Sequence, residues 1–219
     1  LAALIKSNTS AGTRPLSAES LARLATYMTE PTLQKPCWQL IGSLGVATTH
    51  VPAFMEQLLK RLADNDSSVR RLAADALGRM GASAVSEAVL GGLCRALSDD
   101  NSNVRYIAAW ALRRIGDAAA SETVLGGLCR ALSDDNSFVR CSAAKALGAM
   151  GSAAASEAVL GGLCRALSDD DSFVRRNAAK ALGAMGSAAV PALKQLVAPL
   201  PHSDPVSVYY ASTALGQLG

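Results

Sequence analysis

The residues that could carry out acid–base or nucleophilic chemistry are few and widely separated. The 219-residue chain has two histidines, His50 and His202, and five cysteines. Both histidines lie in turn-like sequence close to a proline, and neither stands beside a carboxylate. No Cys-x-x-Cys, His-Glu-x-x-His or Gly-x-Ser-x-Gly motif occurs, so the common signatures of metal sites and activated nucleophiles are missing. We therefore expect no enzymatic activity, no cofactor and no metal site.

Basic and aromatic residues offer a different chemistry, the binding of a partner. They occupy positions that recur every 35 residues but differ in residue type from one copy to the next. Arginine and aromatic side chains gathered on one surface are typical of binding hot spots. The candidate partner-binding residues are Arg71, Arg79, Tyr106, Trp110, Arg114, Phe138, Lys145, Phe173, Arg176, Lys180 and Tyr209.

An internal repeat must position these side chains. The sequence GGLCRALSDD occurs unchanged at Gly91–Asp100, Gly126–Asp135 and Gly161–Asp170. A fixed period of this length predicts an array in which each unit buries its apolar face only against its neighbours. Half of the residues are hydrophobic and only 4% are aromatic, a composition typical of closely packed helices.

Each unit is predicted to contain two helices. In the unit that ends at Gly116, the first helix is expected from Ser86 to Leu97 and the second from about Ser102 to Ile115. Gly116 then stands where a helix ends on a left-handed residue. The Gly91–Gly92 pair is interpreted as a site of close helix approach. The spacing i, i+3, i+4, i+7 predicts that the first helix buries Leu90, Leu93, Cys94 and Leu97.

The second helix divides into three faces at 100° per residue. In the unit that ends at Gly81, one face is a core side and another is a narrow side of small residues around Gly78. The third side carries most of the variation between units, and second helices line the concave surface of such arrays. Summed over all units, that side would carry an excess of about five positive charges, which is typical of a binding groove. The alternative interpretation is a solvated face on which the residue type is little constrained. The third side consists of Ser68, Arg71, Leu72, Asp75 and Arg79.

The second helices share the pattern Asp-x-x-Val-Arg-x-x-Ala-Ala-x-Ala-Leu-Gly-x-Met-Gly. It runs over Asp66–Gly81 and, with small departures, over Asn101–Gly116, Asn136–Gly151 and Asp171–Gly186. The pattern resembles the HEAT repeat, specifically the short variety similar to phycobilisome-lyase HEAT-like repeats. The resemblance implies an all-α, right-handed α-solenoid of about six two-helix units. It also implies a ladder between neighbouring units, in which Arg70, Arg105, Arg140 and Arg175 pair with turn acids such as Asp64, Asp99, Asp134 and Asp169. A phosphate-binding row is the alternative for these arginines.

We expect residues 1–219 to form a single HEAT-like repeat domain that is a piece of a longer array or protein. Residues 1–15 would be the tail of a preceding helix and a loop. The units are expected to end at Gly45, Gly81, Gly116, Gly151, Gly186 and Gly219.

Bulk properties place the chain in the cytoplasm. No uncharged stretch approaches the ~18 residues that a membrane span requires, and the first residues lack the order of a signal peptide. Three cysteines, Cys94, Cys129 and Cys164, recur at one repeat position. They are interpreted as small buried residues in a reducing compartment, and Cys141 is the cysteine predicted to face the groove.

These observations predict a non-catalytic scaffold or sensor arm that recognises a protein or peptide on its concave face, and the positive charge of that face favours an acidic one. Nucleic-acid binding through the same groove is the first alternative, although a net charge of +3 is too mild to imply it alone. A bilin lyase or isomerase subunit is the second, implied by the resemblance only.

Overall fold

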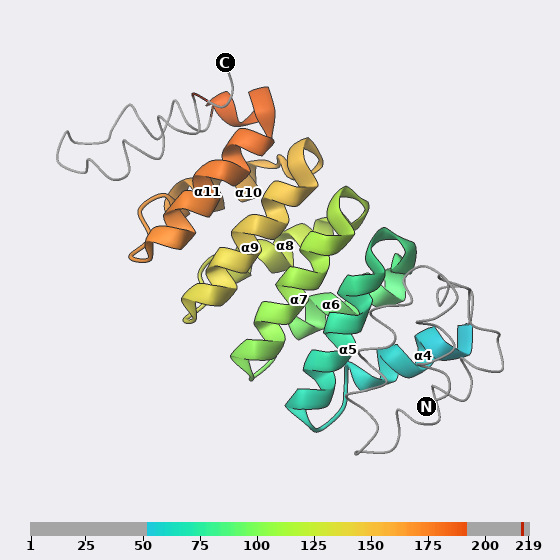
Figure 1. Ribbon diagram of the computed structural model, residues 1–219. Helices are drawn as coiled ribbons and strands as arrows, with labels where there is room; N and C mark the ends of the chain where they lie inside the picture. The colour runs from blue at the N-terminus through green and yellow to red at the C-terminus, as the bar shows by residue number, and fades with distance from the viewer. Residues whose placement is uncertain (1–51, 192–215, 217–219) are drawn as a thin grey trace, which may run out of the picture.

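The chain forms two layers of helices that alternate along a stack (Figure 1). The computed structural model describes residues 52–191 and residue 216. Within them it contains eight α-helices and no strand, so the predicted all-α solenoid of two-helix units is confirmed. The outer layer consists of α4 (Pro52–Arg61), α6 (Glu87–Ala96), α8 (Glu122–Ala131) and α10 (Glu157–Ala166). The inner layer consists of α5 (Ser67–Met80), α7 (Ser102–Ile115), α9 (Ser137–Met150) and α11 (Ser172–Ala184).

Side-chain caps fix where the helices begin. Ser86 precedes α6, and its hydroxyl accepts a hydrogen bond from the N–H of Val89 at 3.2 Å. Asn101 precedes α7, and its side-chain oxygen accepts from the N–H of Asn103 at 3.0 Å. Such caps satisfy N–H groups that have no partner within the helix. The predicted second helix, 102–115, therefore agrees with α7.

Glycines with positive φ end each repeat. Gly81, Gly116 and Gly151 have φ of 61°, 75° and 58° and ψ of −145°, −145° and −139°, and Gly186 has φ of 67°. The sign of φ agrees with the prediction. The ψ values differ from those of a left-handed helical residue and lie in a region that is open almost only to glycine. The chain then runs through a short 3₁₀ helix, such as Gly81–Ala84 or Gly116–Ala119, to the next outer helix.

The core lies between the two layers and is built mainly of leucine and alanine. Leu93, predicted to be buried, is fully buried, and Cys94 and Leu97 are also buried. Leu90 is only half-buried, and Val89 takes the core position instead. The reason is that Leu90 lies in a groove between outer helices, which also involves Leu59 of α4 and Val124 of α8.

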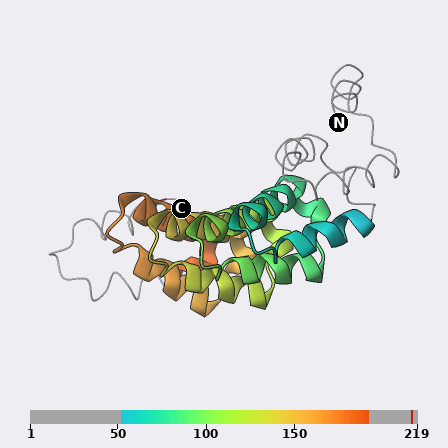
Figure 2. The same ribbon diagram turned by 90° about the horizontal axis from the view of Figure 1, so that it is seen from below.

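The inner helices approach one another more closely than the outer helices do. A β-carbon at Gly78 would lie 2.7 Å from Cα of Ala111 in the next inner helix, which confirms the predicted narrow side. In the outer layer, the nearest atom to such a carbon at Gly92 would be the Leu62 side-chain methyl at 2.9 Å. Only the second glycine of the pair therefore marks a close approach, and it meets a side chain. Tight inner spacing places the inner layer on the concave side of the stack (Figure 2).

Candidate partner-binding face

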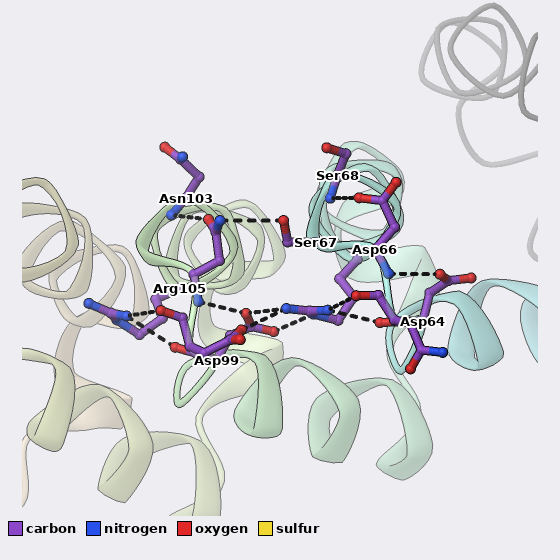
Figure 3. A network of polar contacts seen from close by, with 11 residues as sticks. Asp64, Asp66, Ser67, Ser68, Asp99, Asn103 and Arg105 are labelled. Atoms are coloured by element: carbon purple, nitrogen blue, oxygen red, sulfur yellow. Dashed lines mark hydrogen bonds and ion pairs between the residues drawn. The ribbon is translucent and has the colours of Figure 1, made fainter.

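An arginine ladder joins each turn between outer and inner helix to the next such turn (Figure 3). Arg70 donates from Nε and Nη2 to Oδ2 and Oδ1 of Asp99, at 2.6 and 2.7 Å. The two residues belong to neighbouring units, so the bond ties one unit to the next. The same bidentate geometry, at 2.7–2.9 Å, recurs in Arg105–Asp134 and Arg140–Asp169.

Every N–H donor of Arg70, Arg105 and Arg140 is engaged within the chain, whereas Arg175 donates from Nη1 to the carbonyl oxygens of Asp169 and Asp170, at 2.6 and 3.0 Å. Arg105 donates from Nη1 to the carbonyl oxygens of Asp99 and Asp100 at 3.0 and 3.2 Å. Its Nη2 also donates to Asp135, in addition to the bonds with Asp134. A guanidinium has five N–H donors, and Arg70 and Arg140 fill theirs in the same way. These three arginines therefore hold neighbouring units together, and their N–H donors are not available to bind a phosphate group.

The ladder also explains the charge of its aspartates. Burial would raise the pKa of Asp134, but the hydrogen bonds from Arg105 and from the N–H of Asn136 outweigh it and lower that pKa below its ordinary value. The pKa of Asp99 and of Asp169 is lowered in the same way. Asp64, in the first described turn, pairs instead with Arg61 at 2.8 Å, while its carbonyl oxygen accepts from Arg70.

The predicted partner-binding residues lie on the inner helices, and none of those described is buried. We call this surface the inner face. Arg71 and Trp110 are half-buried, while Phe138 and Phe173 have 72% and 59% of their surface exposed. Tyr209 lies outside the described residues, as do His50 and His202. The remaining members, all exposed, are Arg79, Tyr106, Arg114, Lys145, Arg176 and Lys180.

Some inner-face cations contact a neighbour on the same helix. Arg79 pairs with Asp75 at 2.9 Å. The guanidinium of Arg114 lies 5.8 Å from the centroid of the Trp110 ring. A second such pair joins Arg176 and Phe173 at 5.2 Å. Both distances fall within the range of cation–π contacts, which hold the arginine over the ring and leave its donors open to a ligand.

Most cations of the inner face make no ion pair with another described residue. Within residues 52–191, the ion pairs involve the ladder arginines, Arg61 and Arg79. The inner-face cations that take part in none of these pairs are Arg71, Arg114, Lys145, Arg176 and Lys180.

Two predictions about this face need correction. The position occupied by Leu72 was assigned to the groove, but its equivalents Ser142 and Asn177 are buried, with 4% and 8% exposed. These residues point at the preceding inner helix, since Ser142 donates to the carbonyl oxygen of Tyr106 at 3.4 Å. Cys141 is half-buried and accepts a hydrogen bond from Asn177 at 3.4 Å, so it lies between inner helices instead of on the open face.

A small pocket between two units was not predicted. Tyr106 of α7 and Phe138 of α9 line it, together with polar residues, and its volume is about 220 Å³. The two aromatic residues are 32 positions apart, which is one period minus one helical turn. This separation is the feature of the sequence from which the pocket could have been predicted. The polar lining residues are Ser102, Asn103 and Asn136.

The repeated cysteines differ in burial. Cys94 and Cys164 are buried, as predicted, but Cys129 is only half-buried. Burial raises the pKa of all three thiols above the ordinary value, which disfavours the reactive thiolate. Among the described residues, no group of three or more His, Cys, Asp or Glu side chains is placed to hold a metal ion. No helix in the same part of the chain is long and apolar enough for a membrane crossing.

Family models match most of the repeat array. Residues 55–128 and 156–207 match the model described as HEAT repeats, and residues 124–154 match the model described as HEAT repeat. Together the first two segments cover more than half of the chain. No curated protein matches it.

Solved structures of repeat proteins share the fold. The crystal structure of an engineered protein is 28% identical, covers 90% of this chain and 98% of its own, and has a TM-score of 0.65. A designed armadillo repeat protein in complex with the peptide (KR)4 is 21% identical, with coverages of 91% and 99% and a TM-score of 0.63. A chain from work on microtubule plus end tracking by XMAP215, CLIP-170 and EB1 is 18% identical, with coverages of 94% and 95% and a TM-score of 0.61.

Proposed function

This chain belongs to the HEAT repeat family, and we propose that its solenoid is a non-catalytic scaffold that binds an acidic protein or peptide segment along the inner face. Solenoids of stacked helix pairs present extended concave surfaces, which suit elongated ligands. The designed armadillo relative in complex with (KR)4 illustrates peptide binding by this kind of fold. That peptide is basic, whereas the charge of the inner face in this chain favours the opposite sign.

One observation carries the proposal: the two sets of cations have different surroundings. The ladder arginines are bound within the stack, with Arg105 only 13% exposed at its side chain. Lys145 and Lys180, in contrast, are exposed on neighbouring inner helices and make no ion pair within the described residues. Exposed aromatics lie on the same helices, and aromatic residues together with arginine dominate binding hot spots.

Three further assignments belong to the proposal. The units are of the short variety similar to phycobilisome-lyase HEAT-like repeats. They form one repeat domain of about six units over residues 1–219, and the domain works in the cytoplasm. We attach no pigment chemistry to the motif, because it concerns helix packing and not a cofactor.

Peptide binding measured by fluorescence anisotropy tests the function. The probes are a labelled Glu-rich peptide, a Lys-rich peptide of equal length and a single-stranded oligothymidylate. We expect the Glu-rich peptide to bind best. The double variant Lys145→Glu/Lys180→Glu should weaken this binding about fivefold to tenfold, because each reversal replaces an attraction with a repulsion.

A matched double variant separates the inner face from net charge. Arg130→Glu/Arg165→Glu makes the same charge change on exposed residues of the outer helices α8 and α10, and it should leave binding within twofold of the original. Equal weakening by both variants would reject the inner face as the site. Preferential binding of the oligothymidylate, with a steep salt dependence, would favour the nucleic-acid alternative instead.

A further inference from the structure

We propose that the pocket between Tyr106 and Phe138 holds one large apolar side chain of the acidic segment and thereby fixes its register on the array. This inference rests on the proposed function and deepens it. The two aromatics come from neighbouring units, α7 and α9, and both are exposed: Tyr106 by 36% and Phe138 by 72%. Exposed aromatics on both sides of a hollow favour an apolar occupant because its burial removes apolar surface from water.

The size of the pocket selects a single side chain. Its volume is about 220 Å³, below the roughly 300–1,000 Å³ typical of pockets for whole small molecules. Ser102, Asn103 and Asn136 line the pocket together with the two rings. Polar residues beside the rings suit the polar backbone on either side of an inserted side chain.

The pair of aromatic residues that lines the pocket occurs at only one of the joints between described inner helices. At the joint of α5 with α7, the equivalent positions hold Arg71 and Asn103. At the joint of α9 with α11, they hold Cys141 and Phe173. Only the joint of α7 with α9 places an aromatic residue at both positions. A segment that slid along the array by one unit would therefore lose its apolar contact.

Charge complementarity identifies what accompanies the apolar residue. On the α9 and α11 side of the pocket lie Lys145, Arg176 and Lys180, without ion-pair partners in the described part of the chain. On the α5 and α7 side, Arg79 is already paired with Asp75, while Arg71 and Arg114 make no ion pair in the described part of the chain. The acidic residues of the partner should therefore lie on both sides of its apolar residue, with the larger share toward α11.

The repeat spacing sets the spacing of those acids. Packed helices lie about 8–10 Å apart, and an extended chain advances about 3.3 Å per residue. Successive inner helices therefore meet every third residue of an extended ligand. The expected ligand is an extended peptide with one large apolar residue and with acidic residues about three positions apart, most of them toward α11.

Two peptides that differ at one residue test the inference. Both carry glutamates at every third position, and one has Phe and the other Ser at the anchor position. We expect the Phe peptide to bind the original chain about tenfold more tightly than the Ser peptide does. This is the lower end of the gain in affinity expected from burying a large apolar side chain. Phe138→Asn, which introduces the residue present at 103, should remove this preference, so that the Phe and Ser peptides bind this variant with equal affinity.

The control is Phe173→Asn, the same change at the equivalent position of the next unit, which should retain the tenfold preference. Circular dichroism confirms that each variant keeps its helix content. Binding of both peptides with equal affinity by the original chain, or equal loss of preference in the two variants, would overturn the pocket and leave the proposed function standing. Failure of both peptides to bind would overturn the proposed function itself.

Discussion

Arg105 and Asp134 form a bidentate ion pair across the boundary between two units, although they are 29 residues apart in sequence. The same guanidinium binds the carbonyl oxygens of its own turn. One side chain thus fixes the conformation of one turn and the distance to the next. Because adjacent units share no other ion pair of this burial among the described residues, the ladder should contribute strongly to coupling between units.

Removal of one ladder residue should destabilise the array markedly. Arg105→Ala leaves Asp134, whose side chain is 10% exposed, without its main partner, and breaking such a pair costs several kcal/mol when fully buried. For this partly buried pair we expect a loss of about 2–3 kcal/mol in the free energy of unfolding, measured by urea denaturation. Arg79→Ala, at an exposed pair within one helix, should cost about 0.5 kcal/mol. Similar losses in the two variants would contradict a special role for the ladder.

Acid should unfold the array through the ladder aspartates. Their pKa is lowered in the folded state because the hydrogen bonds from arginine and backbone N–H outweigh burial. A lowered folded pKa means that stabilisation is complete above the unfolded value, about 3.9. It is lost as the pH falls through that value toward the lower folded one. Thermal melts should therefore show a constant Tm from pH 7 to 5 and a steep fall below pH 4.

The variant Asp134→Asn isolates this effect. It should be less stable at pH 7 and should lose less stability than the original chain between pH 5 and 3. Asp117→Asn, at an exposed carboxyl outside the ladder, should follow the original pH profile. A parallel profile for Asp134→Asn would show that other groups control acid unfolding.

Two glycine substitutions should act in opposite directions. Gly78→Ala places a methyl group 2.7 Å from Cα of Ala111, where backbone must move, so we expect a loss of about 1–3 kcal/mol. Gly91→Ala meets nothing nearer than Nη1 of Arg95 at 3.8 Å. It should stabilise the protein by about 0.5–1 kcal/mol through helix propensity. Urea midpoints that shift in the same direction would contradict the packing described for the inner layer.

The repeated thiols should react slowly. Burial raises the pKa of Cys94 and Cys164, and alkylation requires an accessible thiolate. We expect iodoacetamide to label both at least about tenfold more slowly than Cys141, which is half-buried, with rates followed by mass spectrometry of proteolytic peptides. Labelling in denaturant should equalise the rates, and equal rates in the native protein would count against the burial of Cys94 and Cys164.

The sequence was sufficient to predict the helices because their signals are local. Asn101 caps α7 and Gly116 ends it, and both effects depend on residues within one helical turn. The pairing of arginines with turn acids was predicted from the family resemblance, and the structure confirms the partners Asp99, Asp134 and Asp169.

Features that depend on the distance between units could not be predicted from one unit. Val89 lies one turn before Leu93 and is fully buried like it, whereas Leu90 lies in the groove between outer helices and is only half-buried. For the same reason, Ser142 was assigned to the open face although the preceding inner helix covers it. The pocket of Tyr106 and Phe138 needs two units in register, so no single helical projection could reveal it.

The unequal packing of the two layers gives the stack an easy direction of deformation. At Gly78 the inner helices touch through backbone and methyl groups of Ala111, which yield little, whereas Leu62 meets Gly92 with the end of a flexible side chain. We therefore expect the inner joints to act as pivots, with rotamer changes in the outer leucines allowing neighbouring units to rock about them. Binding of a ligand to the inner face should therefore change the curvature of the stack at modest energetic cost, because the outer helices can move closer together or farther apart.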